Sequence, residues 1–352
     1  MSKAARKKSI TIKDVAAASD VSYQTVSRVI NNSPNVKDAV RERVKAAIEK
    51  LGYEPNMAAR RMGGKRSYLI LAINDRARTL DNWSVGRGND WVDQMLYGGM
   101  MECEQHRYRM LFELVDTESP AAVKQLAAAL SSLRPDGVIL TPPHSENQEL
   151  ADLLTANGTP FARIGSAGKT DGINVLMDDR AASFAATKHL IDFGHHRVAF
   201  ISGSAEYLAS TERLDGYRAA MNEAKLQIDQ NWEQPGDFSF ESGSVAAQKL
   251  LTMDQAPTAI IASNDEMAFA VLHQASRLNV SAPESLSVIS FDDTPGVRFS
   301  VPPLTAIRQP IAAMAKRAVS ELINAGGNIG DGIEHFLPFD LVVRNSTGPA
   351  KK

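Results

Sequence analysis

The sequence predicts an N-terminal all-α head of three short helices, followed by a larger α/β body of parallel sheets covered by helices on both faces. Three observations lead to this prediction. The chain has 352 residues, 43% hydrophobic and 23% charged, which is typical of a globular protein of two or three domains. Apolar residues before residue 52 recur at helical spacing. After residue 68, apolar runs alternate with amphipathic stretches.

Charge divides the chain at the same place. Residues 1–66 hold 15 Lys and Arg against 6 Asp and Glu, whereas the rest of the chain holds 24 against 35. A basic head on an acidic body predicts that the head meets a polyanion, because neutralisation of phosphates drives the affinity of proteins for nucleic acid.

Signals for export or membrane insertion are not expected. No apolar run approaches the length of about 18 residues that a membrane span needs, and no apolar stretch follows the basic N-terminus as in a secretory signal. We therefore expect a cytoplasmic, nucleoid-associated protein with no membrane partner. Cys103 is the single cysteine, so it is expected to be a small buried residue on a helix and not part of a disulfide.

The head is predicted to contain three helices. Thr11, followed three residues later by Asp14, is a variant of the capping box that begins the first helix. Ser22 is a suitable N-cap for the second, and the third runs roughly over residues 37–51 and ends at Gly52. Two short helices joined by a tight turn and braced by a third predict a helix-turn-helix.

The second helix places polar side chains on its outer side: Tyr23, Gln24, Ser27, Arg28 and Asn31. In a major groove, Gln pairs with adenine and Arg with guanine, each through two hydrogen bonds. A generic three-helix bundle also has a polar outer face, so the pattern alone leaves that alternative open. The basic charge of the head favours DNA binding.

Three segments carry a family resemblance, namely residues 10–16, 21–32 and 51–56. They closely resemble the lactose/galactose repressor family, and the similarity continues through the rest of the chain. It implies a ligand-responsive, sequence-specific DNA-binding transcriptional regulator. The function it favours is a repressor of carbohydrate uptake or catabolism genes, bound to a near-palindromic double-stranded DNA operator as a homodimer and released by a sugar inducer.

The resemblance also assigns roles within the head. The residues that match DNA contacts of the family are Thr11, Ser22, Tyr23, Gln24, Thr25, Ser27, Arg28 and Asn31. Tyr23, Gln24 and Arg28 match base readers, and the others match phosphate contacts. Asp20 stands where the family usually has a glycine, and we expect the turn to survive because Asp tolerates a left-handed conformation.

Residues 56–62 are predicted to form a short hinge helix that is marginal by itself in water. The resemblance implies that two such helices pair across the dimer and enter the minor groove, with Asn56, Ala59 and Met62 at the DNA. Met62 stands where the family has a leucine that wedges between base pairs. A plain flexible linker is the alternative.

The body is predicted to consist of two similar halves. Strand candidates are residues 69–73, 110–115, 137–140, 161–164, 198–201, 259–262 and 287–291. Helical stretches lie between them, such as residues 121–133, 180–193, 210–224 and 265–278. The resemblance implies a periplasmic-binding-protein-like body of two doubly wound parallel-sheet subdomains.

The predicted organisation has three parts. A helix-turn-helix DNA-binding domain spans residues 1–55, a hinge helix and linker span 56–66, and a ligand-binding and dimerisation domain spans 67–347. Subdomain one is expected at about 67–177 and 309–338. Subdomain two is expected at about 178–308 and 339–347.

Polar residues at strand ends predict a ligand site, because ligands of such folds bind at the carboxyl ends of the strands. The expected contacts are Asp75, Trp83, Arg213, Phe238, Asn264 and Asp292. A carboxylate, an amide and a guanidinium that converge on one cleft suit the vicinal hydroxyls of a sugar. By resemblance, Arg213, Asn264 and Asp292 match ligand contacts of the family, and Phe238 matches an aromatic residue that stacks on the ligand.

Two further expectations concern the tryptophans between the first strand and the next helix, and two aspartates beside expected ligand contacts. Trp83 lies in residues 76–93, a segment longer than the usual loop of the family, and offers a platform for a sugar ring, whereas Trp91 is expected to pack in the helix that follows. Asp265 and Asp293 are expected to cap the turns that follow them rather than to contact ligand.

An enzyme is not expected. The sequence has no P-loop and no Gly-x-Ser-x-Gly elbow, and the adjacent His195 and His196 point apart in an extended segment, which disfavours a shared metal site. No cofactor or metal is expected, and the small-molecule effector is expected to be a mono- or oligosaccharide. The alternatives are a corepressor-dependent repressor that binds a non-sugar metabolite, a plain sugar-binding protein and a constitutive architectural DNA binder.

Overall fold

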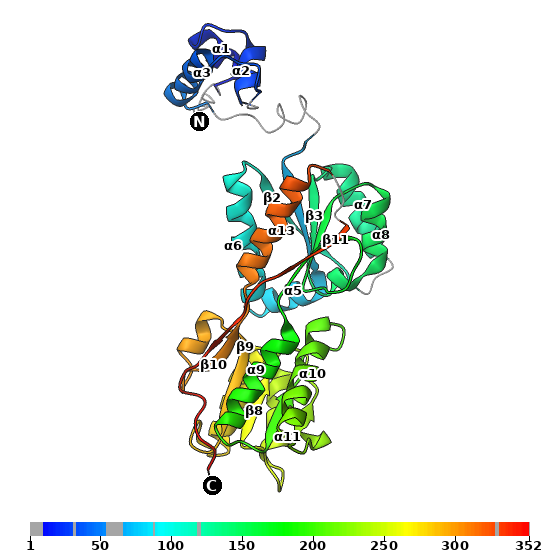
Figure 1. Cartoon of the computed structure of the whole chain (residues 1–352), viewed down its shortest axis with the longest axis vertical. Coiled ribbons are helices and arrows are strands. Elements are labelled where there is room, and N and C mark those ends of the chain that lie inside the picture. Colours follow the sequence, from blue (N-terminus) through cyan, green and yellow to red (C-terminus); the bar gives the residue numbers. More distant parts are fainter. Residues whose placement is uncertain are drawn as a thin grey trace, which may run out of the picture. The chain divides into compact units, whose positions relative to one another are not determined.

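In the computed structural model the described residues are 10–30, 33–53, 66–86, 89–117, 121–327 and 331–351. The chain divides into two compact units, Met1–Tyr68 and Leu69–Lys352, which we name the head and the body. Figure 1 shows that the head is helical and that the body combines strands with flanking helices.

In the described part of the head, three helices pack around a small apolar core. They are α1 (Ile12–Ala18), α2 (Tyr23–Ile30) and α3 (Asp38–Leu51). Val15, Val26 and Val44, one from each helix, are fully buried because each helix turns its apolar stripe inward. The three predicted helices are confirmed.

The turn between α1 and α2 depends on Asp20. Its φ of 49° lies in the left-handed region, which Asp tolerates better than most residues other than glycine. Ser22 then begins α2, where its Oγ accepts a 3.2 Å hydrogen bond from the backbone N–H of Thr25. The turn therefore forms without the glycine that is usual in the family, as expected.

Within its described residues, the body contains two six-stranded sheets, one in each subdomain. The strands of subdomain one are β1 (Leu69–Asp75), β2 (Arg109–Val115), β3 (Gly137–Leu140), β4 (Phe161–Ile164), β5 (Gly172–Leu176) and β11 (Asp331–Phe336). They are ordered β11-β5-β4-β3-β1-β2 and pair in parallel.

The strands of subdomain two are β6 (Val198–Ile201), β7 (Glu233–Gln234), β8 (Ala259–Ala262), β9 (Ser287–Asp292), β10 (Thr305–Arg308) and β12 (Asp340–Val342). They are ordered β12-β10-β9-β8-β6-β7, and the edge strand β12 runs antiparallel to β10 while the others pair in parallel. The seven strands predicted from apolar runs are confirmed.

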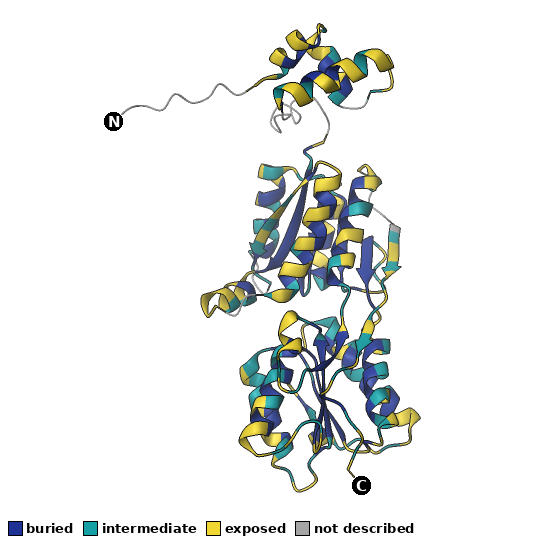
Figure 2. Cartoon of the chain, turned by 90° about the vertical axis from the view of Figure 1, so that its left-hand side faces the viewer, coloured by how far each residue is buried: buried dark blue, intermediate teal, exposed yellow. Residues whose placement is uncertain are grey.

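Helices cover both faces of each sheet, as Figures 1 and 2 show. In subdomain one, α7 (Ala122–Leu133) and α8 (Gln148–Ala156) pack on one face, and α6 (Asp90–Gln105) lies beside α13 (Ile311–Ala325) on the other. Gly98 permits this close approach, because a Cβ at that position would lie 1.9 Å from the carbonyl oxygen of Ala312.

In subdomain two, α9 (Asp179–Asp192) and α10 (Leu208–Glu223) bury one apolar cluster against the sheet, and α11 (Phe240–Leu251) and α12 (Asp265–Arg277) bury another. The chain passes between the subdomains after β5, after β10 and after β11, so α13 returns to subdomain one and β12 to subdomain two. These crossings bring residues distant in sequence to the space between the two sheets.

One element between β1 and α6 differs from the expected loop. It is a helix, α5 (Arg76–Ser84), which Asp75 caps through a 3.2 Å hydrogen bond from the backbone N–H of Arg78. Cys103 is buried on α6, as predicted. Across the described ranges, no helix has both the length and the apolar character that a membrane crossing requires.

Candidate functional site

The first candidate site is the outer side of α2 in the head. Tyr23, Gln24 and Arg28 are exposed there, whereas Val26 and Val29 on the other side are buried. The hydroxyl groups of Ser22 and Thr25 lie 3.0 Å apart at the start of the helix. The helix thus presents to solvent the side-chain types that read base edges in a major groove.

Other predicted DNA contacts have mixed outcomes. The backbone N–H and Oγ1 of Thr11 both donate to the carboxylate of Asp14 at 2.7 Å, so the capping box is confirmed and the Thr11 hydroxyl is engaged within the protein. Ser27 is half-buried. The remaining predicted contacts lie outside the described residues and stay predictions: Asn31, Asn56, Ala59 and Met62.

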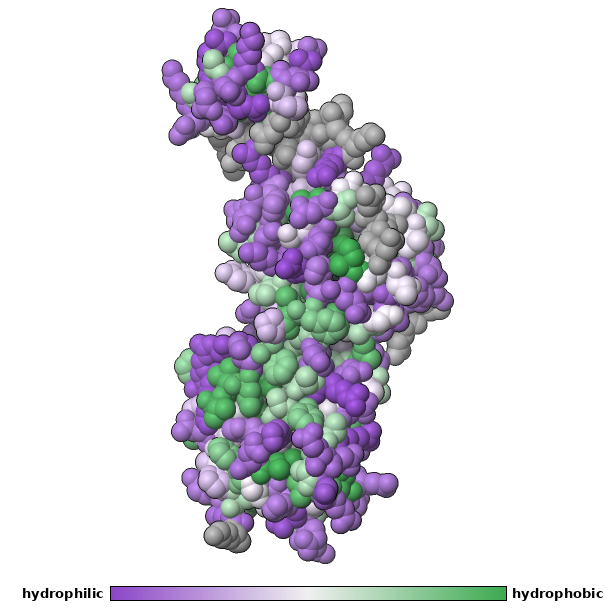
Figure 3. All heavy atoms as spheres, viewed as in Figure 1, coloured by the Kyte–Doolittle hydropathy of each residue, from purple (hydrophilic) through white to green (hydrophobic). Residues whose placement is uncertain are grey.

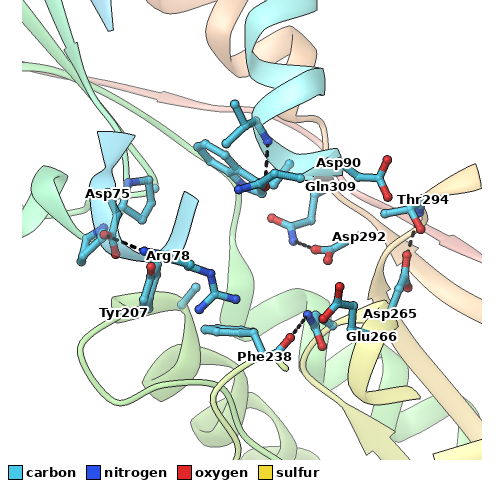
Figure 4. Close-up of a pocket in the computed structure, with 18 of the residues that line it drawn as sticks. Asp75, Arg78, Asp90, Tyr207, Phe238, Asp265, Glu266, Asp292, Thr294 and Gln309 are labelled. Carbon is cyan, nitrogen blue, oxygen red and sulfur yellow. Dashed lines mark hydrogen bonds between the residues drawn. The ribbon is translucent and has the colours of Figure 1, made fainter. Parts of the chain in front are cut away.

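The second candidate site is a cavity of about 550 Å³ in the body, lined by residues of both subdomains. It lies at the carboxyl ends of the parallel strands, where Asp75 ends β1, Asp292 ends β9 and Asn264 follows β8. Five of the six predicted ligand residues line it, namely Asp75, Arg213, Phe238, Asn264 and Asp292. Figure 4 shows Asp75 and Arg78 on one wall and Asp292, Asp265 and Thr294 on another.

Arg213, on α10, is held rigidly at the cavity. Its Nε donates to Oδ1 of Asp179 at 2.7 Å, its Nη1 donates to the carbonyl oxygen of Ser263 at 2.7 Å, and its guanidinium lies 4.3 Å from the ring centroid of Phe291. Among the described residues, Nη2 has no hydrogen-bond partner, so it is available to a ligand. Burial raises the pKa of Asp179, although the charge of Arg213 opposes this effect.

Sequence reasoning missed Asp179. The signal that could have found it is the polar pair Asp178 and Asp179 directly after the apolar run of β5, at the point where the chain crosses to subdomain two. Asp178 caps α9 through a 2.7 Å hydrogen bond from the backbone N–H of Ala181, which leaves Asp179 to pair with Arg213.

Asp292 provides a carboxylate whose charge is sensitive to its surroundings. Burial raises its pKa to about 7, although the Arg213 guanidinium and a hydrogen bond from Nε2 of Gln309 oppose the increase. Burial and the neighbouring Asp292 also raise the pKa of Asp265. A carboxyl group that titrates near neutral pH accepts hydrogen bonds in one protonation state and donates one in the other.

Phe238 and Asn264 form one unit. Nδ2 of Asn264 donates to the carbonyl oxygen of Phe238 at 2.8 Å, and its Oδ1 caps α12 by accepting from the backbone N–H of Met267 at 3.0 Å. The Phe238 ring meets the Tyr207 ring edge-on at a centroid distance of 5.3 Å. Asn264 therefore positions the aromatic wall of the cavity as well as lining it.

Arg78, which the sequence did not single out, connects the two walls. It lies on α5 in subdomain one, and its Nη1 donates to the carbonyl oxygen of Asp237 in subdomain two at 3.1 Å. Its guanidinium also lies 5.0 Å from the ring centroid of Phe238 and 5.6 Å from that of Tyr207. Such contacts are favourable because the guanidinium meets the negative face of each ring.

The expectation that Trp83 contacts the ligand is wrong, whereas Trp91 lies in the helix that follows, as expected, but also lines the cavity. Trp83 does not line the cavity in the described structure, is 47% exposed and packs against Phe112 at a centroid distance of 6.4 Å, whereas Trp91 lines the cavity. The reason is that residues 76–84 are helical. Arg78 and Asn82, four residues apart, share the face toward the cavity, and Trp83 is rotated about 100° beyond Asn82.

The expected capping roles of Asp265 and Asp293 are also wrong. Asn264 is the cap of α12, while Asp265 lines the cavity and its Oδ2 accepts from the backbone N–H of Thr294 at 2.7 Å. Asp293 is bound by Arg308 and Arg344. In the described part of the chain, no group of three His, Cys, Asp or Glu side chains is placed to hold a metal ion.

Comparisons with known proteins give matches for both the head and the body. Residues 11–56 match the model of bacterial regulatory proteins of the lacI family, and residues 187–347 match that of a periplasmic binding protein-like domain. The chain is 32% identical to catabolite control protein A of Priestia megaterium over 90% of this chain and 93% of that protein. It is 31% identical to the HTH-type transcriptional regulator CelR of Thermobifida fusca over 97% and 99% of the two chains.

Two solved structures of transcriptional regulators are also similar to this chain. A complex of the transcriptional regulator CelR with cellobiose is similar with a TM-score of 0.72 and 28% identity, covering 96% of this chain and 99% of that one. A lac repressor dimer bound to operator and an anti-inducer is similar with a TM-score of 0.76 and 26% identity, covering 97% and 100%.

Proposed function

Because the chain belongs to the lacI family of bacterial regulatory proteins, we propose that it is a transcriptional repressor of carbohydrate genes that a sugar releases from its operator. The observation that supports this most strongly is the presence of two sites on one chain. A head with an exposed Tyr23, Gln24 and Arg28 precedes a body with a polar and aromatic cavity. No catalytic step is part of the proposal.

The cavity supports a carbohydrate effector. A free guanidinium nitrogen on Arg213 and the carboxyl group of Asp292 can bind adjacent hydroxyls of one sugar ring, because each group makes directional, charge-assisted hydrogen bonds. Phe238 and Tyr207 supply the apolar surface that the carbon-bound face of a sugar needs. The similar CelR has been solved with cellobiose, which favours a sugar over a non-sugar corepressor.

Exposed apolar residues on the surface of the body support a homodimer. On α6, Tyr97, Met100 and Met101 are exposed, and Leu111 of the edge strand β2 is exposed as well. Figure 3 shows an apolar area on subdomain two near β10, where Phe299 and Val301 are 81% and 90% exposed. A symmetric pair of chains would bury these patches and present two heads to the two halves of a near-palindromic operator.

The experiment that tests the function is selection of duplexes from a random pool by the full-length protein, at a fixed salt concentration because phosphate contacts depend on salt. We expect enrichment of a near-palindromic sequence whose half-sites lie about one helical turn apart. Recovery of sequences without any shared motif would support an architectural DNA binder. Failure to retain any duplex would support a plain sugar-binding protein.

A further inference from the structure

The three tryptophans of the chain have different surroundings. Trp232 is in the core, and its indole N–H donates to the carbonyl oxygen of Gln255 at 3.1 Å. Trp83 is exposed to solvent. Trp91 is half-buried at the cavity, yet within the described ranges its indole N–H has no hydrogen-bond partner and its ring no aromatic neighbour. The ring and the indole N–H of Trp91 therefore line the cavity without a protein partner in the described ranges, and both are available to a ligand.

Trp91 belongs to a different wall of the cavity from the aromatic residues Phe238 and Tyr207. Phe238 and Tyr207 are in subdomain two, whereas Trp91 lies in the first turn of α6 in subdomain one. Figure 4 shows Asp90, its neighbour in the chain, across the cavity from Phe238 and Tyr207, with Asp292 and Gln309 between them. The cavity therefore has aromatic side chains on two walls, one in each subdomain.

Two asparagines also line the cavity from subdomain one. Asn82, on the same face of α5 as Arg78, lines the cavity, and its amide has no hydrogen-bond partner among the described residues. Asn89 uses its Oδ1 to cap α6 through a 3.3 Å hydrogen bond from the backbone N–H of Val92, and its NH₂ group has no partner among the described residues. Amide and carboxylate groups beside an aromatic ring are the groups that bind sugar hydroxyls.

The charge of the cavity favours an uncharged ligand. Its carboxylate-bearing residues are Asp75, Asp90, Glu146, Asp179, Glu241, Asp265, Glu266 and Asp292. The described guanidinium groups that line it are those of Arg78 and Arg213, and Arg213 already pairs with Asp179. Burial raises the pKa of Asp179, Asp265 and Asp292, and Glu146 pairs with Lys169 at 3.4 Å, so not all eight groups carry an uncompensated charge. The remaining carboxylates would still repel a phosphorylated or acidic sugar at close range.

From these contacts we propose that the cavity contains a second sugar subsite, formed by Trp91 with Asn82 and Asn89, and that the effector is an uncharged glycan of at least two rings. One ring lies at Phe238, Arg213 and Asp292, and the next lies at Trp91. The inference rests on the proposed carbohydrate effector and extends it. The cavity volume of about 550 Å³ is within the range of small-molecule sites.

The test is calorimetric titration of the full-length protein with matched sugars. Cellobiose, maltose and lactose are each compared with glucose and galactose, for the wild type, Trp91→Ala, Trp91→Phe and the control Trp83→Ala. We expect one disaccharide to bind the wild type more tightly than its component monosaccharides. Trp91→Ala should weaken that disaccharide about tenfold and the monosaccharides by less than about twofold.

Trp91→Phe keeps a ring and guards against loss of the fold, and we expect it to weaken the disaccharide about threefold. Trp83→Ala should change neither affinity. Equal weakening of disaccharide and monosaccharide by Trp91→Ala, unchanged disaccharide binding, or no preference for any disaccharide would overturn the second subsite and leave the sugar effector standing. Absence of binding by every sugar would overturn the carbohydrate effector itself, and the second subsite with it.

Discussion

The guanidinium of Arg78 lies 5.0 Å from the centroid of the Phe238 ring and donates a 3.1 Å hydrogen bond to the carbonyl oxygen of Asp237. Arg78 belongs to subdomain one and both partners belong to subdomain two, so one side chain joins the two walls of the cavity (Figure 4). A ligand that enters this cavity therefore acts on a contact between the subdomains. Such a contact can link ligand binding to subdomain movement.

Replacing Arg78 tests that link. Arg78→Ala removes the hydrogen bond and the ring contacts, which are worth about 1–2 kcal/mol together. We expect sugar affinity to fall about fivefold to tenfold, because the closed cavity loses a bond between its walls. Titration calorimetry measures the change, with Arg76→Ala on the same helix as the control. An increase in affinity would instead mean that Arg78 competes with the sugar.

Replacing Arg213 should affect both stability and binding. Arg213→Ala leaves the buried Asp179 without its 2.7 Å partner, and an uncompensated buried charge costs about 3–5 kcal/mol. Chemical denaturation should show a loss of this order, with a smaller loss for Arg213→Lys. Sugar binding should be abolished in the alanine variant. Full stability of Arg213→Ala would show that Asp179 finds another partner or a proton.

The stability of the body should depend on pH through Asp292. Burial raises its pKa from 3.8 to about 7, so the folded protein holds a proton that the unfolded chain releases. The contribution of this group is present below pH 4 and is lost as the pH rises to about 7. The unfolding temperature of the wild type should therefore fall more steeply over this window than that of Asp292→Asn. Parallel curves would contradict the raised pKa.

The turn in the head should be strained at Asp20. Its φ of 49° costs a residue with a Cβ more than it costs glycine. Asp20→Gly should therefore stabilise the head by about 0.5–1 kcal/mol in thermal unfolding of the full chain. Destabilisation would show that the Asp20 side chain makes a compensating contact.

Two positions on α2 should determine which operator is bound. Gln24→Ala and Arg28→Ala should each weaken the selected operator by about 1–3 kcal/mol and relax the base preference at one position. Binding to random duplex should change little, because it depends mainly on phosphate contacts. Lys45→Ala on α3, exposed beside Glu42, is the control and should leave the base preference intact.

The sequence predicted the head and most of the body because these parts depend on local patterns. Apolar spacing located α1 to α3, and buried apolar runs located seven strands. Strands β5, β7, β10, β11 and β12 and helix α5 were not anticipated, because their sequences carry polar residues or follow a crossing between subdomains. Pairing after such crossings depends on contacts distant in sequence, which local propensity does not encode.

The candidate cavity was predictable where the family resemblance supplied a position, as for Arg213 on α10, or where a polar residue also ends a strand, as for Asp292. Asp179, Arg78 and Gln309 were not, because each reaches the cavity from an element whose place depends on the tertiary fold. The error on Trp83 arose from one local misassignment. Helical residues 76–84 direct Arg78 and Asn82 inward and turn Trp83 away, whereas a loop places no such constraint.

The central claim is that sugar and operator bind to one chain and affect each other. The most direct measurement is the affinity of the full-length protein for its selected operator, at fixed salt, with and without a saturating sugar, together with the reciprocal titration of the sugar. We predict that the sugar weakens operator binding at least tenfold and that the operator weakens sugar binding by the same factor, as linkage requires. Operator affinity that is identical with and without a bound sugar would contradict the account.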